Sequence, residues 1–532
     1  MSNAPWYKNA VLYEVSVRSF KDSNGDGFGD LPGLIEKLDY LQLLGVDCVW
    51  LMPIYPSPLR DDGYDIADYC SIAPGYGNLG DFRALIESAH ARGIRIIMDL
   101  VLNHTSDEHP WFKAACQDRT SPYRDYYVWS DTDQRFRDAR VIFVDTELSN
   151  WALEPRSGQY YWHRFYSSQP DLNFENPRVV EEIQDVVRFW LRLGIDGFRV
   201  DAVPYLFERE GTNCENLPET HAFLKQLRAL VDREFPGSIL LCEANQWPED
   251  VRAYLGEGDE CHLGFHFPVM PRIFMALRKG RIDDVVEILA RTPPIPEDCQ
   301  WCTFLRNHDE LTLEMVSPQD REWMWEQYAP EPGMRLNLGI RRRLAPLLDN
   351  DLRKVKLANS LLFTLPGTPI LYYGDELGMG DNLSLPDRNG LRTPMQWDDS
   401  QNGGFSSAPP WTGLVEGPLS PARVNASNQL ESPGSLFHAI QRMIQVRKGH
   451  AELGSGTLSW VQVGNPSIAA YARELDGHRL LLLGNLTAER QSFAMEPGHR
   501  GAYRDLIGGN AITVGDANSL SPYEFKWLQP LG

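Results

Sequence analysis

The sequence predicts a (β/α)8 TIM barrel, in which eight parallel strands close on themselves and helices surround them. Eight short runs of apolar and β-branched residues recur between residues 11 and 374, and amphipathic stretches separate them. Alternation of this kind is typical of parallel α/β folds, and eight such units favour a closed barrel. The chain of 532 residues is also long enough to carry further domains.

The predicted strands and helices alternate in a regular order. Strands are expected at 11–17, 48–53, 95–102, 197–203, 238–245, 261–267, 302–308 and 369–374. Between the strands, apolar residues recur at intervals of three and four, which predicts helices at 31–44, 81–92, 179–193, 219–235 and 352–365. Together these elements predict a catalytic barrel formed by residues 1–103 and 173–452.

Three segments depart from this alternation. Residues 104–172, after the third strand, are rich in Asp, Arg, Tyr and Trp and predict an inserted subdomain beside the active site. Residues 310–348, after the seventh strand, are expected to form a lid-like insertion. Residues 453–532 change to short alternating strands, at 457–463, 468–474 and 479–486, which predict a C-terminal antiparallel β-sandwich domain.

Composition excludes several classes of partner. The 51 basic and 73 acidic residues give a formal charge of −22, which would repel nucleic acid and anionic lipid. No basic head followed by an apolar run is visible in residues 1–20, and the apolar stretch 357–373 is interrupted by polar residues and prolines. We therefore expect a cytoplasmic protein with no nucleic acid or membrane partner. The eight scattered cysteines favour free thiols.

Ionisable and amide side chains gather at the ends of four predicted strands, where a TIM barrel brings its active-site residues together. An unpaired buried carboxylate is costly, so this pattern indicates a catalytic site rather than a structural one. The residues are Asp99, Asn103 and His104 on the third strand, Arg199 and Asp201 on the fourth, Glu243 and Asn245 on the fifth, and His308 and Asp309 on the seventh.

Two of these carboxylates suit the cleavage of a glycosidic bond. Arg199 and Asp201 are two residues apart and face the same side of their strand, so Arg199 is expected to lower the pKa of Asp201 and keep it ionised. Glu243 lies among other carboxylates and is expected to keep a proton through a raised pKa. This division of labour between two carboxylates is the chemistry of glycosidic bond cleavage.

The strings DLVLNH, GFRVDAV, CEANQW and FLRNHDE resemble, in this order, the four signature regions of the α-amylase superfamily of retaining glycoside hydrolases. The resemblance covers nearly the whole chain. Longer segments such as PSPLRDDGYDIADY and MRLNLGIRRRLAPLL are most similar to the trehalose synthases, the maltose α-glucosyltransferases that interconvert maltose and trehalose. The resemblance implies that Asp201 is the nucleophile, Glu243 the acid/base and Asp309 the third catalytic carboxylate. It also implies a glucose subsite lined by Tyr64, Asp65, His104, Arg199, His308 and Arg392.

One or two structural cation sites are expected, and no organic cofactor. From 22 to 30 the sequence spaces oxygen ligands at alternate positions, as in the first half of an EF-hand, although Gly33 stands where a bidentate Glu would be. A structural Ca²⁺ or Mg²⁺ is predicted there, and a solvated acidic turn is the alternative. The second site, for Ca²⁺, is implied by the resemblance alone. The expected ligands are Asp22, Asn24, Asp26, the Phe28 carbonyl and Asp30 at the first site, and Asn103, Asp171, the Tyr205 and Leu206 carbonyls and Glu208 at the second.

The reaction depends on what attacks the glucosyl-enzyme. Retained glucose would give trehalose from maltose, whereas water would give two glucoses. Asn245, Glu314 and Arg140 are candidates for closing the pocket around the glucose. An α-glucosidase, an oligo-1,6-glucosidase or a sucrose isomerase remains an alternative, while a catalytically silent binding subunit would lack the nucleophile or the acid. The expected partner is a small disaccharide, and a homo-oligomer and functional association with a maltokinase are compatible with the resemblance.

Overall fold

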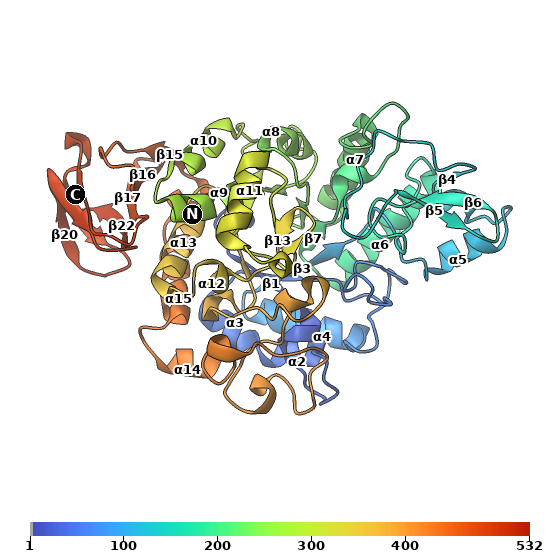
Figure 1. Ribbon diagram of the computed structural model, residues 1–532, viewed down its shortest axis with the longest axis horizontal. Helices are drawn as coiled ribbons and strands as arrows, with labels where there is room; N and C mark the ends of the chain where they lie inside the picture. The colour runs from blue at the N-terminus through green and yellow to red at the C-terminus, as the bar shows by residue number, and fades with distance from the viewer. Residues whose placement is uncertain (1–3, 532) are drawn as a thin grey trace.

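A computed structural model, which describes residues 4–531, has a closed barrel of eight parallel strands at its centre (Figure 1). Each predicted strand overlaps one barrel strand, so the TIM barrel is confirmed. Residues 1–3 and 532, which belong to the predicted barrel and C-terminal segments, lie outside the described residues. In their order around the barrel, the strands are β1 (Leu12–Val15), β2 (Cys48–Leu51), β3 (Arg95–Leu100), β7 (Gly197–Val200), β8 (Ile239–Cys242), β9 (Leu263–Phe265), β10 (Gln300–Phe304) and β14 (Thr368–Tyr372).

The barrel strands are buried on both faces, which explains why they read as continuous apolar runs in the sequence. One glycine allows two neighbouring barrel strands to approach each other closely. Gly197, which begins β7, has a φ of 147°, and a Cβ there would lie 2.2 Å from the carbonyl oxygen of Ile239 on β8. Only glycine allows this contact, and β7 and β8 lead directly to Asp201 and Glu243.

Helices surround the barrel, and their ends follow capping rules. Helix α6, for example, has Asn176 as N-cap and Pro177 at its first position, and it ends at Gly194 in the left-handed region. The predicted helix 31–44 is instead two helices, because the backbone leaves helical geometry at Lys37. The surrounding helices are α2 (Leu31–Glu36), α3 (Leu38–Leu44), α4 (Leu79–Ala91), α6 (Pro177–Leu193), α7 (Pro218–Glu234), α9 (Val269–Lys279), α10 (Asp283–Arg291), α13 (Leu352–Thr364) and α15 (Leu436–Lys448).

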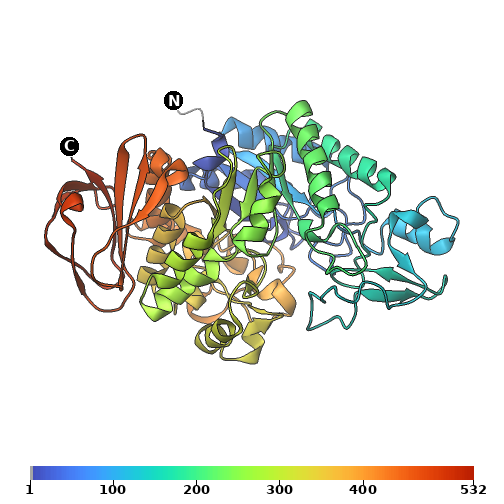
Figure 2. The ribbon, with the colours of Figure 1, turned by 90° about the horizontal axis from the view of Figure 1, so that it is seen from above.

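The segment between β3 and α6 extends away from the barrel and carries a sheet of its own. Its elements are α5 (Pro110–Gln117), β4 (Trp129–Ser130), β5 (Trp151–Glu154) and β6 (Gln159–Trp162), with the sheet order β4-β6-β5. Phe136, Trp151 and Trp162 form its small apolar cluster together with Cys214 from the loop after β7. The two ribbon views place this segment and the C-terminal strands at opposite ends of the molecule (Figures 1 and 2).

The segment after β10 and the C-terminal region also form separate sheets. Segment 310–348 contains β11 (Leu311–Thr312), α11 (Pro318–Tyr328), β12 (Arg335–Leu336), β13 (Gly339–Ile340) and α12 (Leu344–Leu347). The C-terminal strands are antiparallel, as predicted, and form sheets of six and two strands around their own apolar core. They are β15 (Thr457–Trp460), β16 (Ile468–Leu475), β17 (His478–Asn485), β18 (Gln491–Ala494), β19 (Gly501–Asp505), β20 (Ala511–Val514), β21 (Ala517–Leu520) and β22 (Phe525–Pro530). The domain boundaries given above stay predictions.

The remaining short helices are α1 (Val17–Phe20), α8 (Pro248–Val251), α14 (Ala426–Glu431) and α16 (Ala451–Ser455). Across residues 4–531, none of the helices combines the length and the apolar character that crossing a bilayer requires. All eight cysteines are free thiols, and six of them are buried.

Candidate active site

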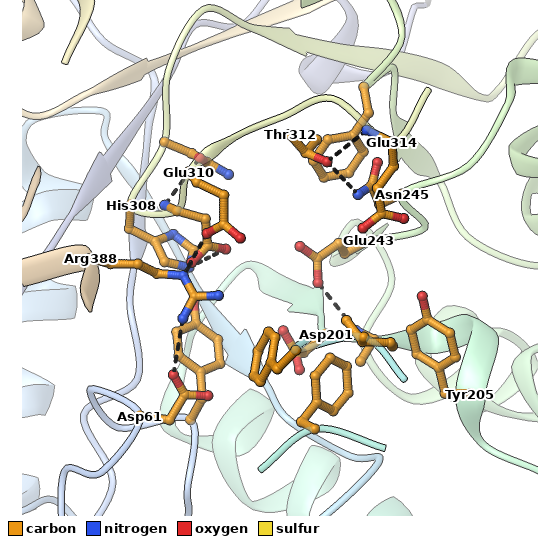
Figure 3. A pocket seen from close by; sticks show the side chains of 18 of the residues that line it. Asp61, Asp201, Tyr205, Glu243, Asn245, His308, Glu310, Thr312, Glu314 and Arg388 are labelled. Carbon is orange, nitrogen blue, oxygen red and sulfur yellow. Dashed lines mark hydrogen bonds and ion pairs between the residues drawn. The ribbon is translucent and has the colours of Figure 1, made fainter. Parts of the chain in front are cut away.

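A cavity of about 140 Å³ lies beyond the carboxyl ends of the barrel strands, between the inserted segment and segment 310–348 (Figure 3). The predicted residues Asp201, Glu243 and Asp309 all line it, and so do Tyr64, His104 and His308. The structure thus brings these six residues together around one cavity. The other lining residues are Asp61, Ile142, Phe143, Phe165, Ala202, Tyr205, Asn245, Phe267, Asn307, Glu310, Thr312, Glu314 and Arg388.

One guanidinium group holds two of the three carboxylates. Arg199, which is 1% exposed, contacts Asp201 through Nη1, and its Nη2 lies 2.6 Å from Oε1 of Glu243. Its Nη1 also donates to Oδ1 of Asp99 at 2.6 Å. Arg199 is thus a buried support beneath the cavity rather than a lining residue, and it brings the carboxylates of β7 and β8 to one place.

The pKa values of this pair differ in part from the expectation. Burial raises the pKa of Asp201 to about 6, because the lowering effect of Arg199 is smaller than the cost of burying the charge. The prediction of a lowered value was therefore wrong in sign. Burial also raises the pKa of Glu243 to about 7. The charges of Asp201 and Asp309 add to this rise, and the charge of Arg199 opposes it. The expected order is kept, because Glu243 retains its proton to a higher pH than Asp201.

The backbone is strained next to Asp201. Ala202 has a φ of 52° and a ψ of 33°, a left-handed conformation that a residue with a Cβ rarely adopts. In this turn the N–H of Ala202 donates to Oε2 of Glu243 at 3.3 Å. The strained turn therefore gives Glu243 a second contact and keeps it directed toward the cavity (Figure 3).

Asp309 is held in its ionised form by surrounding cations. Its Oδ1 lies 3.0 Å from Nε of Arg388, and its Oδ2 lies 3.1 Å from Nε2 of His308. Burial alone would raise the pKa of Asp309, but His308 and Arg388 hold it well below its usual range. Burial would lower the pKa of His308, but Asp309 and Glu14 raise it to about 10. The His308 ring stacks on Tyr64, at an interplanar angle of 13°.

His104 lines the cavity as a neutral imidazole, since burial lowers its pKa to about 4. Its Nε2 lies 3.1 Å from the carbonyl oxygen of Tyr64, and its Nδ1 lies 3.3 Å from the side-chain nitrogen of Asn103. Both ring nitrogens therefore have protein partners here. For His104 to bind a sugar hydroxyl, as the resemblance implies, one of these contacts must be exchanged.

Asp65 does not lie in the cavity, in contrast to its predicted role. Its carboxylate accepts from the hydroxyl of Ser57 at 2.7 Å and from the N–H groups of Arg60 and Asp61 at 3.0 and 3.2 Å, so it shapes the preceding loop. Asp61, on that loop, lines the cavity instead. Burial raises the pKa of Asp61 to about 7, despite the nearby cation of Arg388.

Arg392 lies one layer behind the cavity. Its Nη1 pairs with Asp62 at 2.9 Å and its Nη2 with Asp309 at 3.2 Å. Arg388, four residues earlier, lines the cavity and reaches Asp309 and Glu310. In Figure 3, Arg388 and Asp61 occupy the side of the cavity opposite Tyr205. The sequence motif therefore marked the correct loop but the wrong arginine for direct contact.

The three candidates for closing the pocket come together at its edge. Arg140, on the inserted segment, pairs through Nη1 with Glu314 at 2.7 Å. Asn245 donates from its side-chain nitrogen to the hydroxyl of Thr312 at 3.1 Å. Glu314, Asn245 and Thr312 line the cavity, while Arg140 lies outside it.

Comparison with known proteins places this architecture in a family. The model for the family described as "Alpha amylase, catalytic domain" matches residues 14–328 and 341–456. The chain belongs to the α-amylase family. This confirms the superfamily that the four signature strings indicate. A catalytically silent binding subunit on the same barrel would lack Asp201 or Glu243, and both are present.

Individual relatives make the likeness more specific. The trehalose synthase of Pimelobacter sp. strain R48 is 56% identical over 547 residues, which cover 98% of this chain and 96% of that protein. The trehalose synthase/amylase of Mycobacterium tuberculosis is also 56% identical, over 92% of this chain and 84% of that protein. A solved trehalulose synthase structure from Pseudomonas mesoacidophila MX-45 superimposes with a TM-score of 0.81 at 28% identity, covering 99% and 100% of the two chains. These findings confirm the resemblance to trehalose synthases.

The second expected cation site in this α-amylase family chain has oxygens suited to a cation. Oδ1 of Asn103, Oδ2 of Asp171 and Oε1 of Glu208 are buried and have no hydrogen-bond partner within residues 4–531. Burial raises the pKa of Asp171 to about 8, and burial together with Asp171 raises that of Glu208 well above its usual value. Two buried carboxyl groups and an amide oxygen with free lone pairs fit a hard divalent ion.

The loop 22–30 fits a cation less clearly. Asp22, Asn24 and Asp26 each accept from backbone N–H groups two or more residues later, at distances from 2.7 to 3.0 Å. Asp30 uses both oxygens, one for the N-cap of α2 at Gly33 and one for Ser23. These turns hold the loop in shape by themselves. The free lone pairs on Asn24 and Asp26 still allow an ion. Asp22 accepts from Asn24, Gly25, Gly27 and Ser406, and Asp30 is committed to the helix, so both would have to exchange contacts to bind one.

Several functional residues could not be found from the sequence motifs. Phe143 and Phe165 reach the cavity from the inserted segment, which has no hydrophobic period that marks its inner face. Asp61 adjoins Asp62 in the string RDDGYD, and only the backbone decides which side chain points inward. The spacing of Arg388 from Arg392 was the one available signal, because both lie on the same loop.

Proposed function

We propose that the chain is a trehalose synthase, which converts maltose, with its α-1,4 bond, into trehalose, with its α,α-1,1 bond, and releases some glucose. The observation that carries this proposal is the single guanidinium of Arg199 contacting both Asp201 and Glu243 beneath a small cavity. Two carboxylates within reach of one side chain fit a retaining pair, about 5–5.5 Å apart, better than an inverting pair with its wider gap. The 56% identity to trehalose synthases supports the choice of reaction.

In the first half-reaction, Asp201 attacks the anomeric carbon of the non-reducing glucose of maltose. Glu243 gives its proton to the glycosidic oxygen as the bond breaks, so that free glucose leaves and a glucosyl-Asp201 ester remains. Asp309, ionised between His308 and Arg388, binds ring hydroxyls and stabilises the positive charge that develops on the sugar. Asp61 and Arg388 provide polar groups on the far side of the same sugar.

In the second half-reaction, the released glucose turns within the pocket and presents its anomeric hydroxyl. Glu243, now ionised, takes the proton from that hydroxyl, and the oxygen attacks the ester to give trehalose. Water attacking in its place gives glucose. The Arg140–Glu314 ion pair and the Asn245–Thr312 hydrogen bond, from different parts of the chain, would keep glucose inside and bulk water outside.

A direct test is to incubate the purified protein with maltose and to quantify trehalose and glucose over time. Trehalose as the main product is the expected result. Mostly glucose would favour the α-glucosidase or oligo-1,6-glucosidase alternative, and activity on sucrose with none on maltose would favour a sucrose isomerase.

The pH dependence follows from the two raised pKa values. The active form needs Asp201 ionised and Glu243 protonated, so kcat/KM for maltose should rise as the pH passes about 6 and fall as it passes about 7. The two apparent values belong to the coupled pair rather than to either residue. A profile of kcat/KM from pH 4 to 9 measures them. A plateau that extends to pH 9 would contradict the assignment of Glu243 as the proton donor.

We also propose a structural Ca²⁺ at the second cation site, held by Asn103, Asp171 and Glu208 with the carbonyls of Tyr205 and Leu206. The ion would join the inserted segment to the loop after β7, while the first loop holds Ca²⁺ or Mg²⁺ through Asp22, Asn24, Asp26 and the Phe28 carbonyl. Neither ion takes part in the bond exchange. The disaccharide is the proposed partner, and the cytoplasmic location, a homo-oligomer and association with a maltokinase stay predictions.

Adding Ca²⁺ to chelator-treated protein should raise the Tm, because an ion at one hundred times its Kd stabilises the folded state by about 2.7 kcal/mol. Asp171→Asn should remove most of this rise, since it takes away one of the unpartnered buried oxygens. Asp22→Asn is the matched control for the first loop. A full rise in Asp171→Asn, measured by calorimetry, would rule out the second site.

A further inference from the structure

The edge of the cavity is crossed by charged side chains from three segments of the chain. Arg140 belongs to the inserted segment, Tyr205 to the loop after β7 and Glu314 to segment 310–348. Arg140 donates to Glu314 at 2.7 Å and to the hydroxyl of Tyr205 at 3.2 Å. Tyr205 and Glu314 line the cavity, so Arg140 joins two of its walls from outside.

A fourth residue, Glu215, fixes the position of Arg140. Its Oε1 accepts from Nε of Arg140 at 2.9 Å and also from Nη2 of Arg164. The Arg164 side chain is 1% exposed, and that of Glu215 is 7% exposed, whereas that of Arg140 is 39% exposed. Glu215 therefore links the exposed end of this network, Arg140, to a fully buried arginine of the same inserted segment. Charge-assisted hydrogen bonds of this kind are the stronger ones in proteins.

The backbone around Glu215 is held in an unusual shape. Cys214 and Asn216, on either side of it, have φ values of 55° and 58°, in the left-handed region. The N–H of Asn216 donates to the carbonyl of Pro204 at 3.1 Å, and the N–H of Glu215 donates to Oδ1 of Asn213 at 3.2 Å. Two strained residues so close together persist only where the surroundings impose them, and here they direct the carboxylate toward the two arginines.

We infer that Glu215 is a positioning residue that holds Arg140 across the edge of the cavity. It thereby sets the fraction of the glucosyl-enzyme that reacts with retained glucose and the fraction that reacts with water. Glu215 does not line the cavity, and its ion pairs are with Arg140 and Arg164 rather than with the catalytic residues. It acts through Arg140, because it holds Nε of that side chain while the two Nη groups reach Glu314 and Tyr205. This inference rests on the proposed isomerase function.

Two matched variants, one at Glu215 and one at a control residue, test the role of Glu215. Glu215→Gln keeps the shape of the side chain and removes its charge. Glu210→Gln does the same at Glu210, which is on the same loop and pairs with Arg135 of the inserted segment at 3.1 Å. That control pair is exposed, at 45% and 58%, and neither residue touches the cavity. Glu215→Gln removes the charge that pairs with Arg140 and Arg164, and Glu210→Gln removes the charge that pairs with Arg135. Both variants therefore weaken ion pairing between the same two segments, and only Glu215→Gln affects Arg140.

The measurement is the ratio of the initial rates of glucose and trehalose formation from maltose, together with the rate of p-nitrophenol release from p-nitrophenyl α-glucoside. In Glu215→Gln we expect the glucose-to-trehalose ratio to rise by about five- to tenfold, which corresponds to the net contribution of one ordinary hydrogen bond. The first p-nitrophenol burst should stay within about twofold of wild type, since glucosylation does not need the closed edge. Glu210→Gln should leave the ratio unchanged.

A second variant guards against a simple loss of folding. Glu215→Asp keeps the charge but is one methylene shorter, so it should withdraw the oxygen that Arg140 and Arg164 share and raise the ratio as well. An unchanged ratio in both Glu215 variants, or an equal rise in Glu210→Gln, would overturn the inference while leaving the isomerase proposal intact. A wild-type enzyme that forms no trehalose would overturn both.

Discussion

Asp201→Asn should abolish the formation of both trehalose and glucose from maltose. The amide cannot form the glucosyl ester, and the substitution keeps the volume of the side chain beside Arg199. Because both products arise from that ester, kcat should fall for both by on the order of 10⁴-fold or more. Progress curves with chromatographic separation of the three sugars measure this effect.

A control is needed because Asp201 also helps to balance the charge of Arg199. Asp65→Asn is suitable, since Asp65 is a buried carboxylate of a neighbouring loop that does not line the cavity. It should weaken the loop and lower the Tm while leaving a measurable kcat. Residual turnover by Asp201→Asn above the level of contaminating enzyme would remove Asp201 from the role of nucleophile.

Glu243→Gln should separate the two tasks of the acid/base. With maltose, whose leaving glucose needs a proton, we expect a loss of kcat of about 10²- to 10⁴-fold. With α-glucosyl fluoride, whose leaving group needs no proton, the ester should still form and accumulate, because the amide that replaces the carboxylate cannot activate the acceptor. Mass spectrometry of the intact protein should then show the mass of one added glucosyl group.

Added azide gives the second arm of this experiment, because azide attacks the ester without a general base. It should restore turnover of α-glucosyl fluoride and give α-glucosyl azide, with retention of configuration. A β-configured product would indicate a single inversion and would contradict the double displacement. Equal losses with maltose and with the fluoride would show that Glu243 does not act as the acid.

The barrel was predictable because its strands are buried on both faces and therefore form separate apolar runs. The catalytic side chains follow these runs directly. β7 ends at Val200 and β8 at Cys242, so Asp201 and Glu243 are each the first residue after a strand. The predicted strands were longer than the observed ones at these ends, and that error did not move the site.

Side-chain direction within loops could not be predicted in the same way. Asp61 and Asp65 are four residues apart on one irregular loop, and only the observed hydrogen bonds of Asp65 to Arg60 and Asp61 show which carboxylate supports the backbone. The same holds for Arg388 and Arg392. A loop has no fixed period, so spacing carries no information about which residue faces the cavity.

The sign of the Asp201 pKa shift depends on burial depth, which sequence does not give. The ion pair with Arg199 was predicted correctly from a spacing of two along a strand. Its effect is outweighed because Asp201 is withdrawn from water and lies near Asp99. Contacts between distant segments, such as Arg140 with Glu314, were beyond any local pattern, and the positions of these residues in the sequence made them only candidates.

The most direct test of the whole account is the conversion of unlabelled maltose in the presence of a large excess of ¹³C-glucose, followed by mass spectrometry of the trehalose. A closed pocket that keeps its own glucose predicts trehalose in which both rings are unlabelled. Trehalose carrying one labelled ring, or glucose with almost no trehalose, would contradict the retention of glucose between the two half-reactions.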